Sequence, residues 1–395
     1  MSDTQKHTKP NVPNLRFPGF EGEWKLCTMG EITELFSRRN KKRTDYPMFS
    51  VTNARGFVNQ QEQFEDREMK GDDIAAYKIV SPGEFAYNPA RINVGSIARY
   101  DGETDCMISS LYVCFKAKKE LVDSQLLLHI LKSPKMVYNY GINGEGGVRI
   151  YLFYPNFARI RVKLPPLEEQ RKIASFLDLI EERIQIQSKV IERYKSLIRA
   201  IMQGSQQKAT SIISLGEVLS ERRDLNSEGY QICSVSVSRG IVNQVEYLGR
   251  SFAAKETDHY HVVKEGDIVY TKSPTGSFPY GIIKQSTLAS PVAVSPLYGV
   301  YTPVTPEIGT YLHFYFCSPE NTLNYLRKLI QKGAKNTINI TNNHFLENTI
   351  RIPDKKTMSS TVAAIKTLSS RVEIEISYLR CLELQRDYIL SQMFI

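Results

Sequence analysis

Clusters of basic and amide side chains are the residues of this sequence best suited to chemistry, and that chemistry is binding. Five cations fall within six residues, a density that suits the phosphate oxygens of a nucleic acid. They are Arg38, Arg39, Lys41, Lys42 and Arg43. A solvated basic loop gives the same pattern. The net charge of +9 also favours a polyanionic partner, although ordinary surface basicity produces the same balance.

A second set of polar side chains follows short segments that resemble strands. Arginine can bind guanine through two hydrogen bonds, and asparagine can bind adenine in the same way. The candidates for DNA binding in the first half are Asn53, Arg55, Asn88, Arg91, Asn93 and Arg149. Those in the second half are Arg222, Arg223, Arg239, Lys272, Ser273, Thr275, Ser277, Lys332, Lys335 and Asn336. A polar surface loop explains each of these patterns taken alone, so their recurrence in both halves is the stronger argument.

The sequence shows no catalytic constellation. It has neither a Gly-x-x-x-x-Gly-Lys-Ser/Thr phosphate loop nor Gly-x-Gly-x-x-Gly after a strand. Asn88-Pro89-Ala90-Arg91 departs at its third and fourth positions from the Asn-Pro-Pro-aromatic motif of amino-methyltransferases. His259 and His261 lack a completing ligand cluster, so a structural role is favoured over a metal pair. We therefore expect no catalysis, no cofactor and no metal on this chain.

A long amphipathic helix is expected to position the candidate loops. It follows Pro165-Pro166 and is predicted to end at Gly204, because glycine just past a helix favours termination. Between these signals, apolar residues recur at alternating steps of four and three, which is typical of a coiled-coil seam. The seam positions include Ile173, Leu177, Ile180, Ile184, Gln187 and Ile191. A stripe this narrow requires a partner helix.

The sequence itself contains that partner helix. Adding 188 to each seam position gives a second seam near the C-terminus, which includes Ile365, Leu368, Val372, Glu375 and Leu379. The polar Gln187 corresponds to Glu375, and a buried polar pair there can fix the register of two helices. The pattern also fits an arrangement in which both residues are exposed at the edge of the seam. Two unrelated helices would not explain why Arg161–Pro165 matches Thr349–Pro353 at the same offset.

The segments before the two helices repeat more loosely, which indicates a duplicated protein. Arg55–Gln60 corresponds to Arg239–Gln244, and Gly30–Ile32 to Gly216–Val218. Short strand-like runs and a helix near Ser124–Leu131 indicate an α+β, or mixed α/β, fold. The predicted organisation is a tail at 1–22, a globular domain at 23–164, a helix at 165–204, a second globular domain at 205–352 and a second helix at 353–395.

Composition favours a reducing, cytoplasmic setting. The six cysteines form no Cys-x-x-Cys pair and no zinc-finger spacing. No apolar run approaches the roughly 20 residues that a membrane span needs. Met1–Asn14 is polar and lacks the apolar core of a signal peptide. We expect no membrane association.

The sequence resembles the DNA-specificity subunit of Type I restriction-modification systems over essentially its whole length. Leu164–Ala174 is similar to the start of that family's central helix and is the most specific motif present. Leu15–Phe20, followed by Trp24, resembles the family's beginning in Gram-positive bacteria, in a staphylococcal-like branch. In the second copy, Pro353–Thr357 departs from the usual Pro-Leu-Glu-Glu-Gln pattern.

The resemblance implies two target-recognition domains with pseudo-two-fold symmetry, separated by two long antiparallel coiled-coil helices. Each domain would read one half of a bipartite site in double-stranded DNA. The helices would dock two methylation subunits that use S-adenosylmethionine, and restriction subunits that use ATP and Mg would join the complex.

The expected helix length suits such a spacer. A helix of 37 residues spans about 55 Å, and one turn of duplex is about 34 to 36 Å long. Two alternatives remain open. A coiled-coil adaptor for proteins would lack direct DNA readout, and a DNA enzyme would need a cofactor or nucleophile motif.

Overall fold

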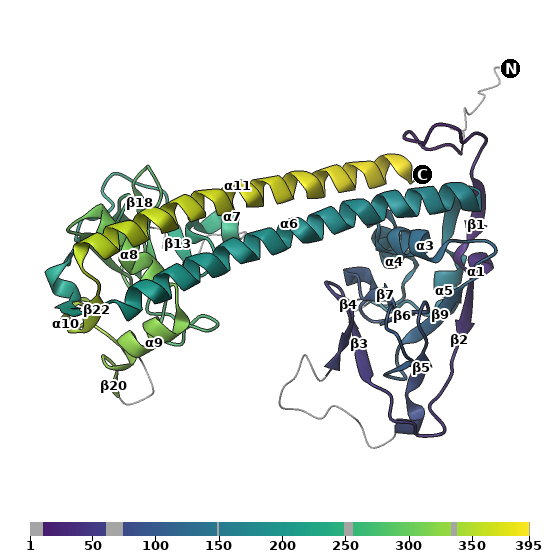
Figure 1. Cartoon of the computed structure of the whole chain (residues 1–395), viewed down its shortest axis with the longest axis horizontal. Coiled ribbons are helices and arrows are strands. Elements are labelled where there is room, and N and C mark those ends of the chain that lie inside the picture. Colours follow the sequence, from purple (N-terminus) through teal and green to yellow (C-terminus); the bar gives the residue numbers. More distant parts are fainter. Residues whose placement is uncertain (1–10, 61–73, 148–149, 249–255, 333–337, 395) are drawn as a thin grey trace. The chain divides into compact units, whose positions relative to one another are not determined.

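The computed structural model describes residues 11–60, 74–147, 150–248, 256–332 and 338–394, and the chain divides into two compact units. Unit 1 comprises Met1–Ser188 and Tyr378–Ile395, and unit 2 comprises Lys189–Ser377. Each unit combines small sheets with short helices and with part of both long helices (Figure 1). The predicted mixed helix-and-strand fold is confirmed.

Unit 1 is built on two four-stranded sheets. The first is antiparallel and has the order β2 (Thr33–Phe36), β9 (Val113–Ala117), β6 (Phe85–Tyr87) and β7 (Ile97–Arg99). The second has the order β4 (Gly56–Asn59), β3 (Met48–Thr52), β8 (Cys106–Ile108) and β5 (Lys78–Val80), with β3 and β8 parallel. A separate pair joins β1 (Lys25–Thr28) to β10 (Arg161–Leu164). The short helices are α1 (Met29–Ile32), α3 (Ser124–Lys132), α4 (Pro134–Asn143) and α5 (Tyr154–Arg159).

Unit 2 repeats this strand order and adds one short strand pair. Its four-stranded sheet has the order β12 (Leu219–Glu221), β19 (Gly299–Pro303), β16 (Ile268–Tyr270) and β17 (Ile283–Gln285). Three strand pairs accompany it: β13 (Cys233–Ser236) with β14 (Gly240–Asn243), β15 (His261–Val263) with β18 (Val292–Val294), and β11 (Ser211–Ser214) with β22 (Thr349–Ile352). A short pair, β20 (Gln331–Lys332) with β21 (Ile338–Asn339), follows α8 (Pro306–Phe316) and α9 (Pro319–Arg327). The other short helices are α7 (Gln244–Leu248) and α10 (Asn342–Glu347).

The parallel pairing of β3 with β8 in unit 1 is reduced in unit 2 to a single bridge. Met48 pairs with Met107 in unit 1, whereas the corresponding bridge joins Ile232 to Ala293. Both links are parallel. The duplication inferred from sequence therefore extends to strand order and direction.

Each unit also has the same capping box after its first strand. The Thr28 backbone N–H and hydroxyl donate to Glu31, and those of Ser214 donate to Glu217. In both boxes the Ser or Thr oxygen also caps the helical turn that follows. These reciprocal bonds satisfy donors that the turn leaves unpaired.

The two long helices are α6 (Leu167–Gln207) and α11 (Lys355–Met393). The predicted end of α6 at Gly204 is wrong, because the helix continues for three more residues. Glycine inside a helix costs only about 0.5–1 kcal/mol relative to alanine. Burial of Met202 and Ser205 in unit 2 holds the last turn in place.

Within each unit, the two helix segments pack in opposite directions. In unit 1, Ile173 and Leu177 share a core with Ile389 and Met393. Further along α6, Glu181 pairs with Arg386. In unit 2, the cluster includes Ile198, Met202, Met358 and Ile365. No described helix has the length and apolar composition needed to cross a bilayer.

The seam positions are buried or half-buried. Ile173, Leu177, Ile184, Ile191 and Ile365 are buried, whereas Ile180, Leu368, Val372 and Leu379 are half-buried. The polar Gln187 and Glu375 are also buried, at 8% and 6% exposure. Glu375 pairs with Arg371 at 2.5 Å. The alternative in which Gln187 and Glu375 are exposed at the edge of the seam is therefore wrong.

Candidate nucleic-acid interface

The turn between β3 and β4 presents Asn53 and Arg55 to solvent. The Thr52 hydroxyl accepts a hydrogen bond from the Arg55 backbone N–H at 3.1 Å and donates to the Gly56 carbonyl at 3.3 Å. Gly56 has φ +64°, and a Cβ there would lie 3.1 Å from the Ala98 side chain. Glycine is therefore required to close the turn, and the turn fixes the position of the arginine.

The loop between β6 and β7 carries Asn88 and Arg91 and is bonded to the same hairpin. The Asn88 side-chain oxygen accepts from the Ala90 backbone N–H at 3.0 Å, which shapes the start of the loop. At its end, the buried Ser96 hydroxyl donates to the Val51 carbonyl at 2.7 Å. This bond ties the loop to β3.

These two loops border an open cavity of about 510 Å³ in unit 1. Polar residues in its lining include Asn53, Arg55, Gln60, Asn88, Arg91 and Ser96. Four side chains that were selected as candidates from the sequence thus lie around one cavity. Asn93 lies half-buried in the same loop. The arginines and amides offer both hydrogen-bond donors and acceptors, which is what contact with base edges requires.

Unit 2 contains the same hairpin. The Ser236 hydroxyl accepts from the Arg239 backbone N–H at 3.4 Å, and Gly240 has φ +70°. Arg239 is exposed at the turn. It occupies the position that Arg55 has in unit 1.

The neighbouring loop, between β16 and β17, has different chemistry from its counterpart. Ser273, Thr275 and Ser277 are exposed, and burial lowers the pKa of Lys272. The Thr275 backbone bonds to Phe278 in both directions, at 3.0 and 2.9 Å, which folds the loop tip into a tight turn. Hydroxyls thus replace the amides and arginine of unit 1.

The predicted basic cluster lies at the other end of β3 from Asn53. Buried Asn40 holds its turn, because its side chain donates to the Thr44 carbonyl and accepts from the Thr44 N–H. Arg38 pairs with Glu84 and lies over the Phe36 ring. The other cations, Arg39, Lys41, Lys42 and Arg43, are exposed.

This basic cluster is not repeated in unit 2. Buried Asn226 forms the equivalent turn by accepting from the Tyr230 N–H at 2.7 Å. That turn carries Ser227, Glu228 and Gly229 where unit 1 has three cations. Both units therefore share the asparagine-bonded turn, but only the turn of unit 1 carries this cluster of cations.

The remaining predicted contacts have mixed outcomes. Arg222 bonds to Asp267 at 2.7 Å and to Asp224 at 2.9 Å, and the Asp267 side chain is only 1% exposed. This geometry favours a structural role for Arg222 over the predicted DNA contact. Arg223 pairs with Glu221 but remains largely exposed. Arg149, Lys335 and Asn336 lie outside the described residues, and the Lys332 side chain also does.

Two polar residues within the Leu164–Ala174 motif have a structural role that was not predicted from the sequence. Glu169 and Gln170 are buried in unit 1. The Gln170 side chain donates to the Leu121 and Pro165 carbonyls and accepts from the Asp123 N–H at 2.8 Å. These bonds join the helix to the loop before α3. Their signal in the sequence was a pair of polar residues directly before the apolar seam.

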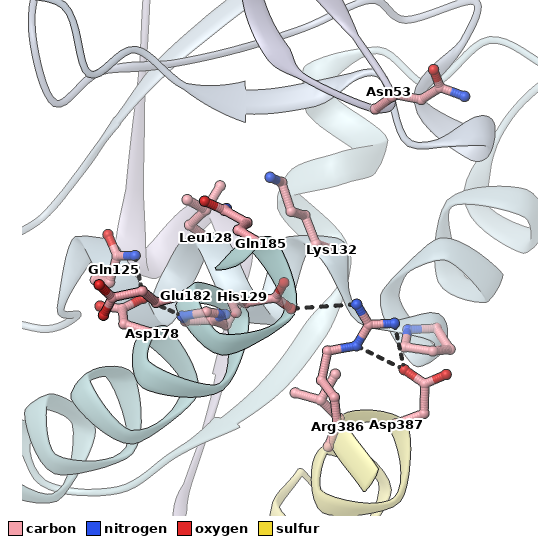
Figure 2. Close-up of a pocket in the computed structure, with 14 residues that line it drawn as sticks. Asn53, Gln125, Leu128, His129, Lys132, Asp178, Glu182, Gln185, Arg386 and Asp387 are labelled. Carbon is pink, nitrogen blue, oxygen red and sulfur yellow. Dashed lines mark hydrogen bonds and ion pairs between the residues drawn. The ribbon is translucent and has the colours of Figure 1, made fainter. Parts of the chain in front are cut away.

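A second cavity of unit 1, of about 560 Å³, lies between α3, the α6 and α11 segments and Asn53. Figure 2 shows Gln125 and His129 directed at Asp178, with distances of 2.5 and 2.7 Å. Arg386 pairs with Asp387 and with Glu181. The charged groups here largely bind one another. Among the described residues, no group of three His, Cys, Asp or Glu side chains is placed to hold a metal ion.

Comparison with known sequences finds similarity in the first half of the chain. Residues 21–195 match the model of the Type I restriction modification DNA specificity domain. A type I restriction enzyme specificity subunit of Methanocaldococcus jannaschii is 22% identical over 200 residues, which are 48% of this chain and 46% of that protein. Another from Haemophilus influenzae is 33% identical over 163 residues, 40% of each chain. The matches thus cover less than half the length of these relatives.

Comparison with solved structures concerns the whole fold. The S subunit of a Type I restriction-modification system from M. genitalium aligns over 97% of this chain and 99% of its own, with a TM-score of 0.58 and 11% identity. A chain from a study of type I R-M complex assembly aligns over 94% and 97%, with a TM-score of 0.53 and 15% identity. At these identities the likeness establishes the fold. In sequence, residues 21–195 are similar to the Type I restriction modification DNA specificity domain.

Proposed function

We propose that this chain is the DNA-specificity subunit of a Type I restriction-modification complex. Unit 1 reads one half of a bipartite site in double-stranded DNA, and unit 2 reads the other. The observation that carries this proposal is the repeated hairpin, in which Arg55 and Arg239 follow equivalent hydroxyl-bonded turns. A shared frame with different neighbouring loops suits the reading of two different sequences.

The side chains divide into two kinds of contact. Arg55, Arg239 and the amides of Asn53 and Asn88 are suited to base edges, where a bidentate pair discriminates by about 1–3 kcal/mol. The exposed cations at 41–43 are suited to phosphates, which position the protein without reading sequence. Only unit 1 has this second set, so we expect it to supply more of the salt-dependent affinity.

The long helices are proposed to bind the methylation subunits. In unit 1, Leu179 and Ile186 lie seven residues apart on α6, and Leu384 and Tyr388 lie four apart on α11. All four are more than half exposed. Large apolar side chains exposed in pairs on a helix are typical of a surface that binds another protein.

The chemistry of the complex is assigned to its other subunits. Two methylation subunits use S-adenosylmethionine, and restriction subunits use ATP and Mg. The chain itself is non-catalytic and acts in the cytoplasm, where the DNA lies. Its contribution is the choice of sequence.

Single substitutions of the hairpin arginines test this proposal. Arg55→Ala and Arg239→Ala, each assembled with the methylation subunits, should each relax one different half of the methylated site, as mapped by long-read sequencing. Arg351→Ala, an exposed arginine on β22, is the matched control. The proposal fails if neither half-site changes, or if both variants relax the same half.

Binding to duplex DNA distinguishes the proposed specificity subunit from the alternative of a coiled-coil adaptor. A specificity subunit binds DNA with an affinity that falls as salt rises. A coiled-coil adaptor shows no such binding with or without the methylation subunit.

A further inference from the structure

One of the six cysteines lies in a cluster of basic groups. The Cys317 sulfur, at the end of α8, is 3.2 Å from Lys284 Nζ and 3.8 Å from His313 Nε2. Lys284 comes from β17 and is 6% exposed. The cluster lies within unit 2 and plays no part in the proposed DNA contacts.

Lys284 needs an anion in this position. A buried ammonium is unfavourable unless it is paired. Within the described part of the chain, the Cys317 sulfur is the only hydrogen-bond partner that the structure gives its side chain. A thiolate satisfies the ammonium, whereas a neutral thiol does not.

His313 supports the same charge state. Its Nδ1 accepts a hydrogen bond from the Gln285 backbone N–H at 3.0 Å. The ring proton of the neutral imidazole therefore lies on Nε2, the nitrogen that faces the sulfur. Both neighbours of Cys317 are thus donors directed at it.

At the three buried cysteines, no such pair of donors offsets the effect of burial. Burial raises the pKa of Cys106 and Cys114 to about 12 and that of Cys233 to about 11. Burial opposes ionisation of Cys317 as well, but His313 and Lys284 together lower its pKa to about 7. Residue Cys317 is also partly exposed, whereas Cys106, Cys114 and Cys233 are buried. A thiolate that is accessible is the reactive form of cysteine.

We propose that Cys317 is a site of reversible oxidation by peroxide, with Lys284 and His313 as the groups that hold it in its reactive form. The thiolate sulfur attacks one oxygen of hydrogen peroxide, and a sulfur–oxygen bond forms as the oxygen–oxygen bond breaks. Sulfur loses two electrons and the peroxide is reduced. The departing hydroxide takes a proton from the Lys284 ammonium and leaves as water, and the product is a sulfenic acid.

Oxidation of Cys317 changes the charges next to Lys284. Oxidation thus converts the thiolate–ammonium pair into a neutral sulfenic acid beside a neutral amine, and the charge attraction between Cys317 and Lys284 is lost. Lys284 pairs with Val269 across β16 and β17, and the loop that these strands enclose carries Lys272 and Ser273. A thiol reductant restores the thiolate and the original contact.

The test uses the full chain, hydrogen peroxide, a dimedone trap for sulfenic acid and peptide mass spectrometry. Cys317 should be trapped about tenfold faster at pH 7 than buried Cys114 or exposed Cys381, with a pH midpoint near 7. Lys284→Met should slow trapping about tenfold and shift the midpoint upward, whereas Cys381→Ser should leave the Cys317 rate unchanged. Circular dichroism checks that the variant folds, and the wild-type pH profile does not depend on it. Trapping of Cys317 no faster than of Cys381, or a midpoint above 8, overturns the proposal.

Discussion

Arg16 binds Glu169 through two parallel hydrogen bonds, with Nε to Oε1 at 2.8 Å and Nη2 to Oε2 at 2.7 Å. The Glu169 side chain is fully buried at the start of α6. Arg16 also donates to the Gly22 and Glu21 carbonyls. The Arg16–Glu169 salt bridge therefore holds the N-terminal segment against the first turn of α6.

Removal of Arg16 should destabilise unit 1 strongly. Arg16→Met leaves the Glu169 carboxylate buried without its cation, which costs about 3–5 kcal/mol in comparable buried pairs. Hydrogen exchange should accelerate in residues 11–24 and in the first turns of α6. Arg171→Met, at an exposed position two residues further along the helix, is the control. Equal protection in both variants would contradict this account.

The basic turn at 41–43 should control the salt dependence of DNA binding. Each lost phosphate contact lowers the slope of log K against log salt by about 0.9. Lys42→Gln should therefore lower the slope by about that amount for any duplex sequence, as measured by titration at several salt concentrations. Lys119→Gln, at another exposed lysine of unit 1, should not change it. A sequence-dependent loss would instead assign Lys42 to base readout.

The capping boxes should make both units sensitive to acid. Hydrogen bonds from Thr28 and from Ser214 lower the pKa values of Glu31 and Glu217 below their ordinary value of 4.5. A lowered folded pKa gives stability that is present above the unfolded pKa and is lost as pH falls through the folded value. Urea unfolding between pH 6 and 3 should thus depend less on pH in Glu31→Gln and Glu217→Gln than in the wild type. An unchanged pH dependence in both variants would show that the capping boxes do not cause the sensitivity to acid.

The buried polar residues of the seam should favour a single spacing at the expense of stability. Replacing both Gln187 and Glu375 with leucine should raise the free energy of unfolding by about 1–4 kcal/mol, as found when buried polar groups are exchanged for apolar ones. Methylation maps should then contain sites with more than one spacer length. A variant that loses stability and keeps one strict spacing contradicts the prediction.

Helix length should set the spacer. Inserting one heptad in both α6 and α11 preserves the seam and adds roughly 10.5 Å, which corresponds to about three base pairs of duplex. Methylation mapping should find the same half-sites separated by a longer unread spacer. Unchanged spacing rejects the helices as the measuring element.

The sequence by itself determined the repeated architecture and the long helices. A seam such as Ile173, Leu177 and Ile184 is encoded in the spacing of neighbouring residues, so it is visible without coordinates. The same holds for the hairpin turns, because the Thr52 and Ser236 turns each need a glycine at a fixed distance. The repeated turn pattern in the sequence thus identified Arg55 and Arg239 as equivalent residues.

Tertiary structure alone decided how the candidate residues are used. It brought Asn53 and Asn88 to one cavity, because the Ser96 bond to Val51 joins loops that are far apart in sequence. It turned Arg222 inward to Asp267, 45 residues away, and continued α6 beyond Gly204. Such outcomes depend on packing and on pairing of charges across the fold, and no short-range spacing encodes them.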